Sequence, residues 1–294
     1  MNFPTAYKQI IERMDAVDPV VYGKNRNYLD GAVTYLSPYI SRGVISTKQV
    51  FESILNKGFK LYEIEKFVQE LAWRDYWQQI WKHRGADINN DFRNKQEKVS
   101  KEGIPINITN GNTGIAAIDK GIHQLYETGY MHNHLRMYLA STACNVAECH
   151  WKLPAQWMYY HLLDADWASN ALSWQWVCGA NAHKLYYANQ ENINRFCNTD
   201  QKNTFLDFET EQLRSIPIPN ELENTFTPNL ACNLPTTDTI ELDPLKDTLI
   251  YNFYNLDPNW RSELKNVNRV LLLEPSVFEQ YPVSQKSIDF MIEL

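Results

Sequence analysis

The segment LYEIEKFVQELAWRDYWQQIWKHRG, residues 61–85, gives the clearest helix signal in the chain and decides the fold class. Its apolar residues recur every three or four positions, and it closes on a basic turn, KHR, followed by Gly85. Such an ending is typical of a helix C-terminus. The same periodicity predicts further helices over residues 114–128, 132–148, 155–163 and 167–178. Short loops join these segments, which indicates a mainly α fold.

The composition is that of a globular protein with no membrane-spanning segment. The chain has 294 residues, of which 44% are hydrophobic and 21% charged, enough for one large core or two ordinary ones. No apolar run reaches the roughly 20 residues that span a bilayer, and the N-terminal stretch resembles an amphipathic helix more than a signal peptide. A cytoplasmic protein is therefore expected. Five cysteines form no CxxC pair, so neither a metal site nor a disulfide framework is predicted.

The net charge of −7 is unevenly distributed along the chain. Residues 1–200 carry 21 basic and 20 acidic side chains, a balance of +1, whereas residues 201–294 carry 7 and 15, a balance of −8. A local basic patch decides whether a protein binds nucleic acid. The acidic C-terminal third therefore does not exclude a nucleic-acid partner for the first two thirds.

The last hundred residues differ in character from the helical part. Residues 198–240 are rich in Asn, Thr and Pro, which predicts a linker or a wrapped arm. Strand-like runs follow at 248–254 and 269–275, and then a helical stretch interrupted by Pro282. The expected organisation is a helical domain over 1–200, a linker or arm over 201–240 and a partial, short α/β-like C-terminal segment over 241–294.

One face of the 61–85 helix combines polar and aromatic residues. Glu70 and Arg74 are four apart, which favours either an ordinary helical ion pair among core aromatics or a functional face. Three tryptophans, at positions 73, 77 and 81, are more than one helix usually needs to fill a core. The shared face consists of Phe67, Glu70, Arg74, Trp77 and Trp81.

A second polar stripe lies on the predicted helix that begins near residue 132. Asn133 and Arg136 follow the same helical spacing as apolar Met137. Buried polar groups must find partners, either on another helix or on a ligand. His132 and His134 flank Asn133, but two residues apart on a helix their rings diverge, which argues against a metal site.

Two carboxylates precede the predicted helix at 167. Asp164 and Asp166 are most simply explained as a helix cap with an acidic neighbour. Asn170 and Trp174 follow four residues apart, so an amide and a planar ring lie near the carboxylates. This combination also suits a large conjugated ligand with a polyol tail.

Four motifs in order resemble the FAD-binding catalytic domain of DNA photolyases and cryptochromes. They are VTYLSPYISRGVIS from residue 33, FVQELAWRDYW from 67, TGIAAIDKGIHQLYETGYMHNHLRM from 113 and LLDADWASNALSWQW from 162. The resemblance extends over about residues 20–197. It implies an all-helical FAD-binding domain, with FAD as the cofactor and UV-damaged DNA as the partner. It implies no metal, and it leaves protein partners open.

The resemblance also implies which residues hold FAD. Arg74 matches a diphosphate contact, Arg136 and Asp164 match a pair beside the isoalloxazine ring, and Asn170 matches the residue facing flavin N5. Phe67 and Tyr130 stand where the family usually has tryptophan. The implied FAD contacts are Tyr22, Val33, Thr34, Tyr35, Leu36, Ser37, Phe67, Arg74, Asn133, Arg136, Asp164, Asp166 and Asn170.

The implied reaction is light-driven repair of a flipped pyrimidine dimer by reduced FAD. Glu70 would hydrogen-bond the damaged base while Trp73 and Trp176 stack on it. A basic rim of Lys24, His183 and Lys184 would extend the DNA contacts. The implied substrate contacts are Arg26, Glu70, Trp73, Asn133, His134, Met137 and Trp176.

Trp174 and Trp151 match the inner and middle members of the family's electron relay, and with Glu70 and Asn170 they complete the expected catalytic set. No Trp or Tyr lies between residues 82 and 125, so the outer relay member is missing. Trp157, Tyr159 and Tyr160 are candidates to replace it.

The main alternative to repair is a cryptochrome-like blue-light sensor, with a flavin-binding remnant as a third possibility. His134, where the family usually has Arg, and the acidic C-terminal third favour the sensor, whereas Glu70 favours repair.

No counterpart of the family's N-terminal α/β domain precedes the motifs, and residues 240–294 are a candidate for a relocated one.

Overall fold

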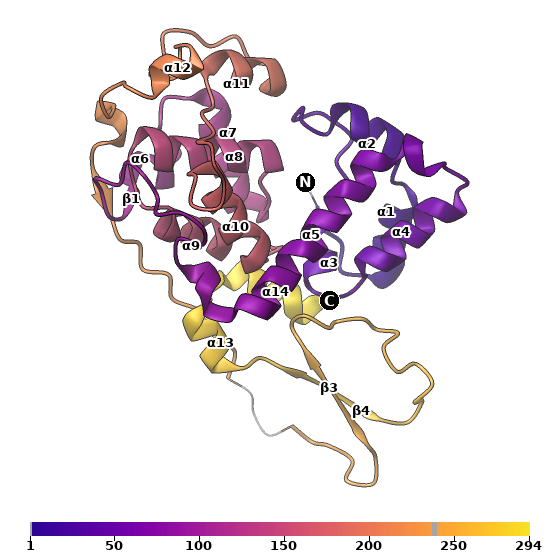
Figure 1. The fold of residues 1–294 in the computed structure, drawn as a ribbon. Coiled ribbons are helices and arrows are strands. Elements are labelled where there is room, and N and C mark those ends of the chain that lie inside the picture. The colour runs from indigo at the N-terminus through magenta and orange to yellow at the C-terminus, as the bar shows by residue number, and fades with distance from the viewer. Residues whose placement is uncertain (1, 237–239) are drawn as a thin grey trace.

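The structure, a computed structural model, describes residues 2–236 and 240–294, and helices are its predominant secondary structure (Figure 1). In this described part, strands occur only as two two-stranded sheets. The predicted mainly α fold with a short α/β-like C-terminal segment is confirmed.

Helix α5, Glu65–Arg84, occupies most of the segment that decided the fold class. The predicted helix over 61–85 is divided, because a 3₁₀ turn η1, Leu61–Glu63, precedes it. Between the two, Ile64 has φ −113° and ψ 10° and buries its side chain, so the α-helix begins only after it. Gly85 ends the helix with φ 53°, a conformation that glycine adopts without strain.

Four helices supply most of the core: α7 (Ala116–Thr128), α8 (Asn133–Ser141), α9 (Lys152–His161) and α10 (Trp167–Val177). The predicted helix over 132–148 continues beyond Ser141 only as a π turn, Thr142–Val146. There the Thr142 hydroxyl donates to the Tyr138 carbonyl at 2.9 Å. Single π turns of this kind commonly interrupt α-helices at functional sites.

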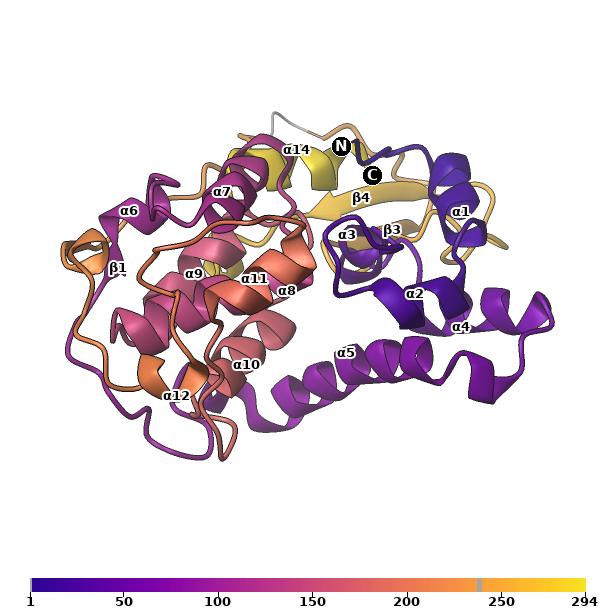
Figure 2. The ribbon, with the colours of Figure 1, turned by 90° about the horizontal axis from the view of Figure 1, so that it is seen from above.

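The N-terminal helices form a second group. The amphipathic helix predicted at the N-terminus begins at Tyr7 and buries Ile10 and Met14 on one face. Figure 2 shows α5 extending between this group and the group that contains α8 and α10. The N-terminal helices are α1 (Tyr7–Asp15), α2 (Pro19–Asn25), α3 (Ser37–Ser41) and α4 (Thr47–Asn56).

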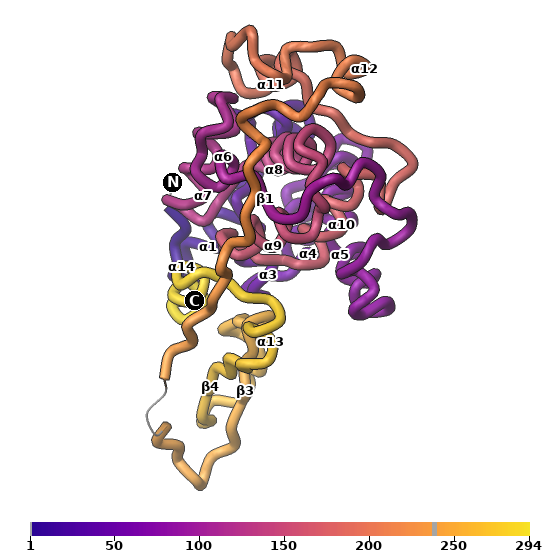
Figure 3. Tube along the Cα trace, turned by 90° about the vertical axis from the view of Figure 1, so that its left-hand side faces the viewer, coloured from indigo at the N-terminus to yellow at the C-terminus, as the bar shows by residue number. Residues whose placement is uncertain are grey.

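The proline-rich segment after residue 198 runs along the outside of the helical body (Figure 3). Leu206, Leu213 and Leu222 are buried and anchor it there. Strand β2 pairs antiparallel with β1 of the body. The elements of this part of the fold are η2 (Gly85–Asn89), β1 (Ile104–Pro105), α6 (Ile106–Thr109), α11 (Gln190–Cys197), α12 (Thr210–Leu213), η4 (Asn220–Leu222) and β2 (Thr225–Phe226).

The C-terminal segment is a parallel strand pair followed by two helices. Strands β3 (Thr248–Asn252) and β4 (Asn268–Leu272) pair in parallel. The predicted second strand is shorter than 269–275 because Pro275 begins helix α13, Pro275–Gln280, and proline favours the first helical position. Helix α14, Gln285–Glu293, starts after Pro282, the predicted break.

Helix α14 packs on the helical body. It buries Ile288, Phe290 and Met291, and the Ser287 hydroxyl donates to the Leu162 carbonyl at 3.1 Å. The proposed division of the chain at residues 200 and 240 stays a prediction. Over residues 2–236 and 240–294, no helix is long and apolar enough to cross a lipid bilayer.

Candidate functional site

The loop before α3 has an irregular backbone. Tyr35 has φ 55°, in the left-handed region, and the Thr34 hydroxyl accepts a hydrogen bond from the Leu36 amide at 3.3 Å. Non-glycine residues in this region are concentrated at functional sites. The loop carries the predicted contacts Val33, Thr34, Tyr35, Leu36 and Ser37, and Tyr22 of α2 lies nearby in the chain with its ring edge-on to Phe67.

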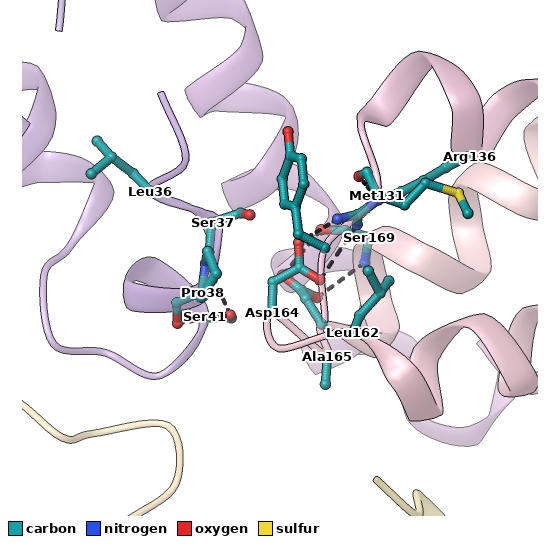
Figure 4. Close-up of polar contacts among 12 residues, drawn as sticks. Leu36, Ser37, Pro38, Ser41, Met131, Arg136, Leu162, Asp164, Ala165 and Ser169 are labelled. Carbon is teal, nitrogen blue, oxygen red and sulfur yellow. Dashed lines mark hydrogen bonds and ion pairs between the residues drawn. The ribbon is translucent and has the colours of Figure 1, made fainter. Parts of the chain in front are cut away.

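Asp164 and Arg136 form a two-point ion pair. Arg136 Nη2 lies 3.0 Å from Asp164 Oδ2 and Nη1 lies 3.4 Å from Oδ1, while Nε donates to the Met131 carbonyl. Figure 4 shows Asp164 between Ser37 of α3 and Arg136 of α8. Burial alone would raise the pKa of Asp164, but the charge and hydrogen bonds of Arg136, with the charge of Arg74, hold that pKa below its ordinary value.

Asp166 caps helix α10 and collects further donors. It accepts from the Ser169 amide at 3.1 Å and from Gln78 Nε2 at 2.7 Å. Arg74 Nη2 lies 2.9 Å from its Oδ2, but without the angle of a hydrogen bond, so this buried nitrogen retains an unused donor. The predicted cap is therefore present together with a cation that can bind a second anion.

Arg74 and Glu70 are not partners. Glu70 pairs with Arg26 of the loop after α2, at 3.3 Å, and Arg74 reaches across to Asp166. The interpretation of an ion pair between Glu70 and Arg74 on α5 is wrong. Arg74 pairs with the buried Asp166 instead, because a buried carboxylate needs a counter-ion more than the partly exposed Glu70 does. Arg26, predicted to contact DNA, and Glu70, predicted to contact the damaged base, thus contact each other.

Asn170 and Trp174 lie on α10, both buried. The Asn170 side-chain nitrogen donates to the Ala155 carbonyl at 2.8 Å, and no protein donor among the described residues bonds its oxygen. The Trp174 indole nitrogen is buried and has no hydrogen-bond partner among the described residues. Both side chains therefore have unused polar atoms.

Two large aromatic side chains of the predicted substrate set are exposed to solvent. Trp73 is 51% exposed and Trp176 is 43% exposed, against 2% for Trp174. Asn133 is exposed at the start of α8, so the alternative that it is a buried partner for another helix is wrong. Met137 is partly buried. Exposed tryptophans are uncommon on a surface that has no ligand to bind.

The histidines of α8 are held by backbone groups. His134 Nδ1 lies 2.8 Å from the Asn27 carbonyl, and its ring stacks on Tyr138 with centroids 4.5 Å apart. His132 Nδ1 accepts from the His134 amide. Burial, with the charge of its neighbours His134 and Arg136, lowers the pKa of His132 to about 4. In the described residues, no cluster of three or more His, Cys, Asp or Glu side chains could hold a metal ion.

Arg42, which the sequence analysis did not select, joins the site to the C-terminal segment. The residue is 1% exposed, and its guanidinium donates from Nη2 to the carbonyls of Asp164 and Ala165, each at 2.9 Å. Nη1 lies 3.4 Å from Met291 Sδ of α14. In the sequence, the only sign of a role for Arg42 is its place in the motif VTYLSPYISRGVIS, directly after Ser41. Gln78 was missed as well, although it lies one helical turn after Arg74.

The residues fit a large, partly anionic, planar ligand. Helix α5 buries only Phe67 fully, so Arg74, Trp77 and Trp81 remain partly open on the face it turns to the site. Arg74 has an unused buried donor, and Asn170 and Trp174 have unused polar atoms. A cavity of about 550 Å³ borders this face between α5, the α3–α4 turn and Tyr254, and of the predicted site residues it includes Arg74.

The helical fold and this donor set define the class of a flavin-binding helical domain. The family described as the FAD binding domain of DNA photolyase matches residues 67–229, more than half of the chain. The chain belongs to this photolyase and cryptochrome family, and its cofactor is FAD.

Relatives and solved structures are similar to this chain over part of their length. The deoxyribodipyrimidine photo-lyase of Alkalihalophilus pseudofirmus is 28% identical over 202 residues, 67% of this chain and 42% of the relative. The Synechocystis cryptochrome superposes with a TM-score of 0.61 at 22% identity, over 67% of this chain and 44% of that one. The Sulfolobus tokodaii photolyase, solved with two FAD molecules, gives 0.57 at 24% identity, over 65% and 44%. The match thus spans less than half of each of these proteins.

Proposed function

We propose that this protein is a DNA photolyase that repairs pyrimidine dimers in UV-damaged DNA with light. The observation that carries the proposal is the exposure of Trp73 and Trp176, which lie on the helices that also carry Arg74 and Asn170. A flipped base needs flat apolar walls and a few polar groups at its edge. Cytoplasmic location remains an expectation of this proposal.

The proposed cofactor contacts divide by charge. Arg74 would bind the diphosphate with the donor that Asp166 leaves unused, since a guanidinium suits phosphate oxygens. Arg136 would lie at the isoalloxazine, where its positive charge favours the reduced anionic ring. The side-chain oxygen of Asn170 would accept a hydrogen bond from a protonated flavin N5, because its side-chain nitrogen already donates to the Ala155 carbonyl. When bound, reduced FAD would supply light-driven electron transfer to the dimer.

Glu70 is the proposed contact to the damaged base. One of its oxygens binds Arg26, which leaves the second oxygen for a base edge. Arg26 and the exposed Lys24, His183 and Lys184 would contact DNA phosphates around the lesion. Pairing with Arg26 keeps the Glu70 carboxylate oriented before the base arrives.

The experiment is blue-light repair of an oligonucleotide carrying one cyclobutane dimer, with protein loaded with FAD. Glu70→Gln should lower repair by about ten-fold or more, because a hydrogen bond to a charged group contributes roughly 1.5–3 kcal/mol. Glu65→Gln, exposed on the same helix, is the matched control and should repair at the wild-type rate.

Wild-type protein that holds FAD and leaves the dimer intact would refute repair. A light-induced change in hydrogen exchange of α14 in that same protein would instead favour the blue-light sensor. The Arg42 contacts, which join the Asp164 loop to α14, are the observation in favour of this second function.

A further inference from the structure

A series of aromatic rings continues beyond Trp151, the proposed middle member of the electron relay. Trp151 and Trp167 are stacked with centroids 6.4 Å apart and an interplanar angle of 29°. Trp167 lies 5.9 Å from Tyr281, and Tyr281 lies 5.6 Å from Trp81. Electron tunnelling falls steeply with distance, so rings this close exchange electrons far faster than rings separated by intervening protein.

Hydrogen bonds link the same residues. The Trp167 indole nitrogen donates to Asn89 Oδ1 at 2.6 Å, and Asn89 Nδ2 donates to the Tyr281 hydroxyl at 3.2 Å. Asn89 therefore fixes both rings and supports the Tyr281 oxygen as an acceptor, which leaves the phenolic hydrogen free to point elsewhere.

Trp151 itself is placed for oxidation. Its indole nitrogen donates to Asp91 Oδ1 at 2.8 Å, and His150 Nε2 lies 3.3 Å from the same oxygen. A carboxylate beside an indole N–H stabilises the positive charge that forms when the ring loses an electron. Asp91 would thus stabilise the oxidised Trp151 ring until an electron from the outer rings reduces it.

We propose that Trp167 and Tyr281 are relay residues that carry electrons from the surface to Trp151, with Tyr281 replacing the missing outer member. The proposal rests on the proposed function, because it assumes FAD beside Trp174. Tyr281 belongs to the C-terminal segment, between α13 and α14, so that segment contributes a redox group to the helical domain. Tyr281 is itself partly exposed, so the route reaches solvent at its ring.

The electrons and protons balance with a soluble thiol as the reductant. Trp174 would give one electron to bound, light-excited oxidised FAD and would be refilled in turn from Trp151, Trp167 and Tyr281. Tyr281 loses one electron to Trp167 and its phenolic proton to water, which gives a neutral tyrosyl radical. The thiol returns one electron and one proton to Tyr281, and two resulting thiyl radicals combine as a disulfide.

The other candidates for the outer position have poorer geometry. Trp157 packs on Tyr126 and His161, outside this series of rings. Tyr159 touches Trp167 at 5.4 Å but is only 4% exposed, so it has no exit to solvent. The Tyr160 hydroxyl donates to the Ala231 carbonyl, and its ring contacts His161.

The test is electron paramagnetic resonance and transient absorption of the FAD-loaded protein under blue light, with dithiothreitol as the thiol. Wild type should show a tyrosyl radical. Tyr281→Phe should abolish that radical and speed charge recombination, and Trp167→Phe should do the same. Tyr160→Phe is the matched control and should keep the wild-type signal.

A tyrosyl signal that survives in both Tyr281→Phe and Trp167→Phe would overturn the route. Trp174→Phe separates this outcome from a failure of the proposed function. Photoreduction unchanged in Trp174→Phe would refute the proposed placement of FAD, whereas photoreduction lost in Trp174→Phe but unchanged in Tyr281→Phe would refute the route alone. Thermal unfolding of each variant checks that the fold is intact.

Discussion

Helices α5 and α10 are both rich in tryptophan, yet their environments differ. Of the 11 residues of α10, 8 are buried, among them Trp167 and Trp174. Of the 20 residues of α5, only Phe67 is buried, and Trp73 is half exposed. The rings of Trp167 and Trp174 are covered, whereas Trp176 of α10 and the tryptophans of α5 stay partly or largely exposed. The same residue type therefore contributes to the core at some positions and to the surface at others.

The largest expected effect is the loss of the ion pair beside α10. Arg136→Ala would leave the buried Asp164 carboxylate without its main counter-ion. Breaking such a pair costs about 3–5 kcal/mol in the free energy of unfolding. Urea denaturation measures this cost, and Arg195→Ala, an exposed arginine, is the control. A loss as small as that of the control would mean that Asp164 is not held by Arg136.

Removal of FAD should affect the two helices unequally. A ligand at about 100 times its Kd adds about 2.7 kcal/mol to stability, and this contribution disappears with the ligand. The amides of α5 should lose most protection in hydrogen exchange mass spectrometry, because all its side chains but that of Phe67 are at least partly exposed without the ligand. Equal loss in α5 and α10 would show that FAD does not rest on α5.

Acid should weaken the α8–α10 region through buried histidines. Burial lowers the pKa of His132 and of His161 to about 4 each, against an ordinary value of 6.5. Below pH 6.5 the unfolded chain binds these protons and the folded chain does not, so stability is complete above that pH and falls down to about pH 4. The expected loss is about 1–3 kcal/mol. The depressed pKa of Asp164 acts in the same direction, as its stabilisation is lost on further acidification through that pKa.

Thermal melts between pH 7.5 and 4.5 measure the histidine effect. His161→Phe keeps a ring among Tyr126 and Trp157 and should flatten the pH dependence. His83→Asn removes an exposed histidine from α5 and should leave it unchanged. A His161→Phe profile as steep as that of wild type would assign the acid sensitivity to other groups.

Local sequence signals predicted the elements well but not the contacts between them. Gly85 and Pro282 set helix ends through their own backbone preferences, and Asp166 caps α10 as its position indicated. The partners of Glu70 and Arg74 could not be predicted, because these partners, Arg26 and Asp166, are distant from α5 in the chain. Asp91 lies in a loop with no helical or strand periodicity, and nothing local indicates that it accepts from the Trp151 indole.

The ordered motifs of the first two thirds indicated the family because each keeps its residue types and spacing within one short stretch of the chain. Arg42 was overlooked for the opposite reason, since its partners come from the Asp164–Ala165 loop and from α14, 122 and 249 residues further along the chain. A pattern in one stretch of sequence does not record which distant carbonyl a side chain will meet.

The burial of Arg42 makes the C-terminal helix part of the protein's structural frame. A nick or truncation before α14 would uncover one side of a guanidinium whose other side holds the backbone at Asp164 and Ala165. Gly43 adds a second constraint, because a methyl group there would lie 2.0 Å from the Tyr254 carbonyl oxygen. A force applied to α14 would therefore act through Arg42 directly on the backbone that presents the Asp164 carboxylate.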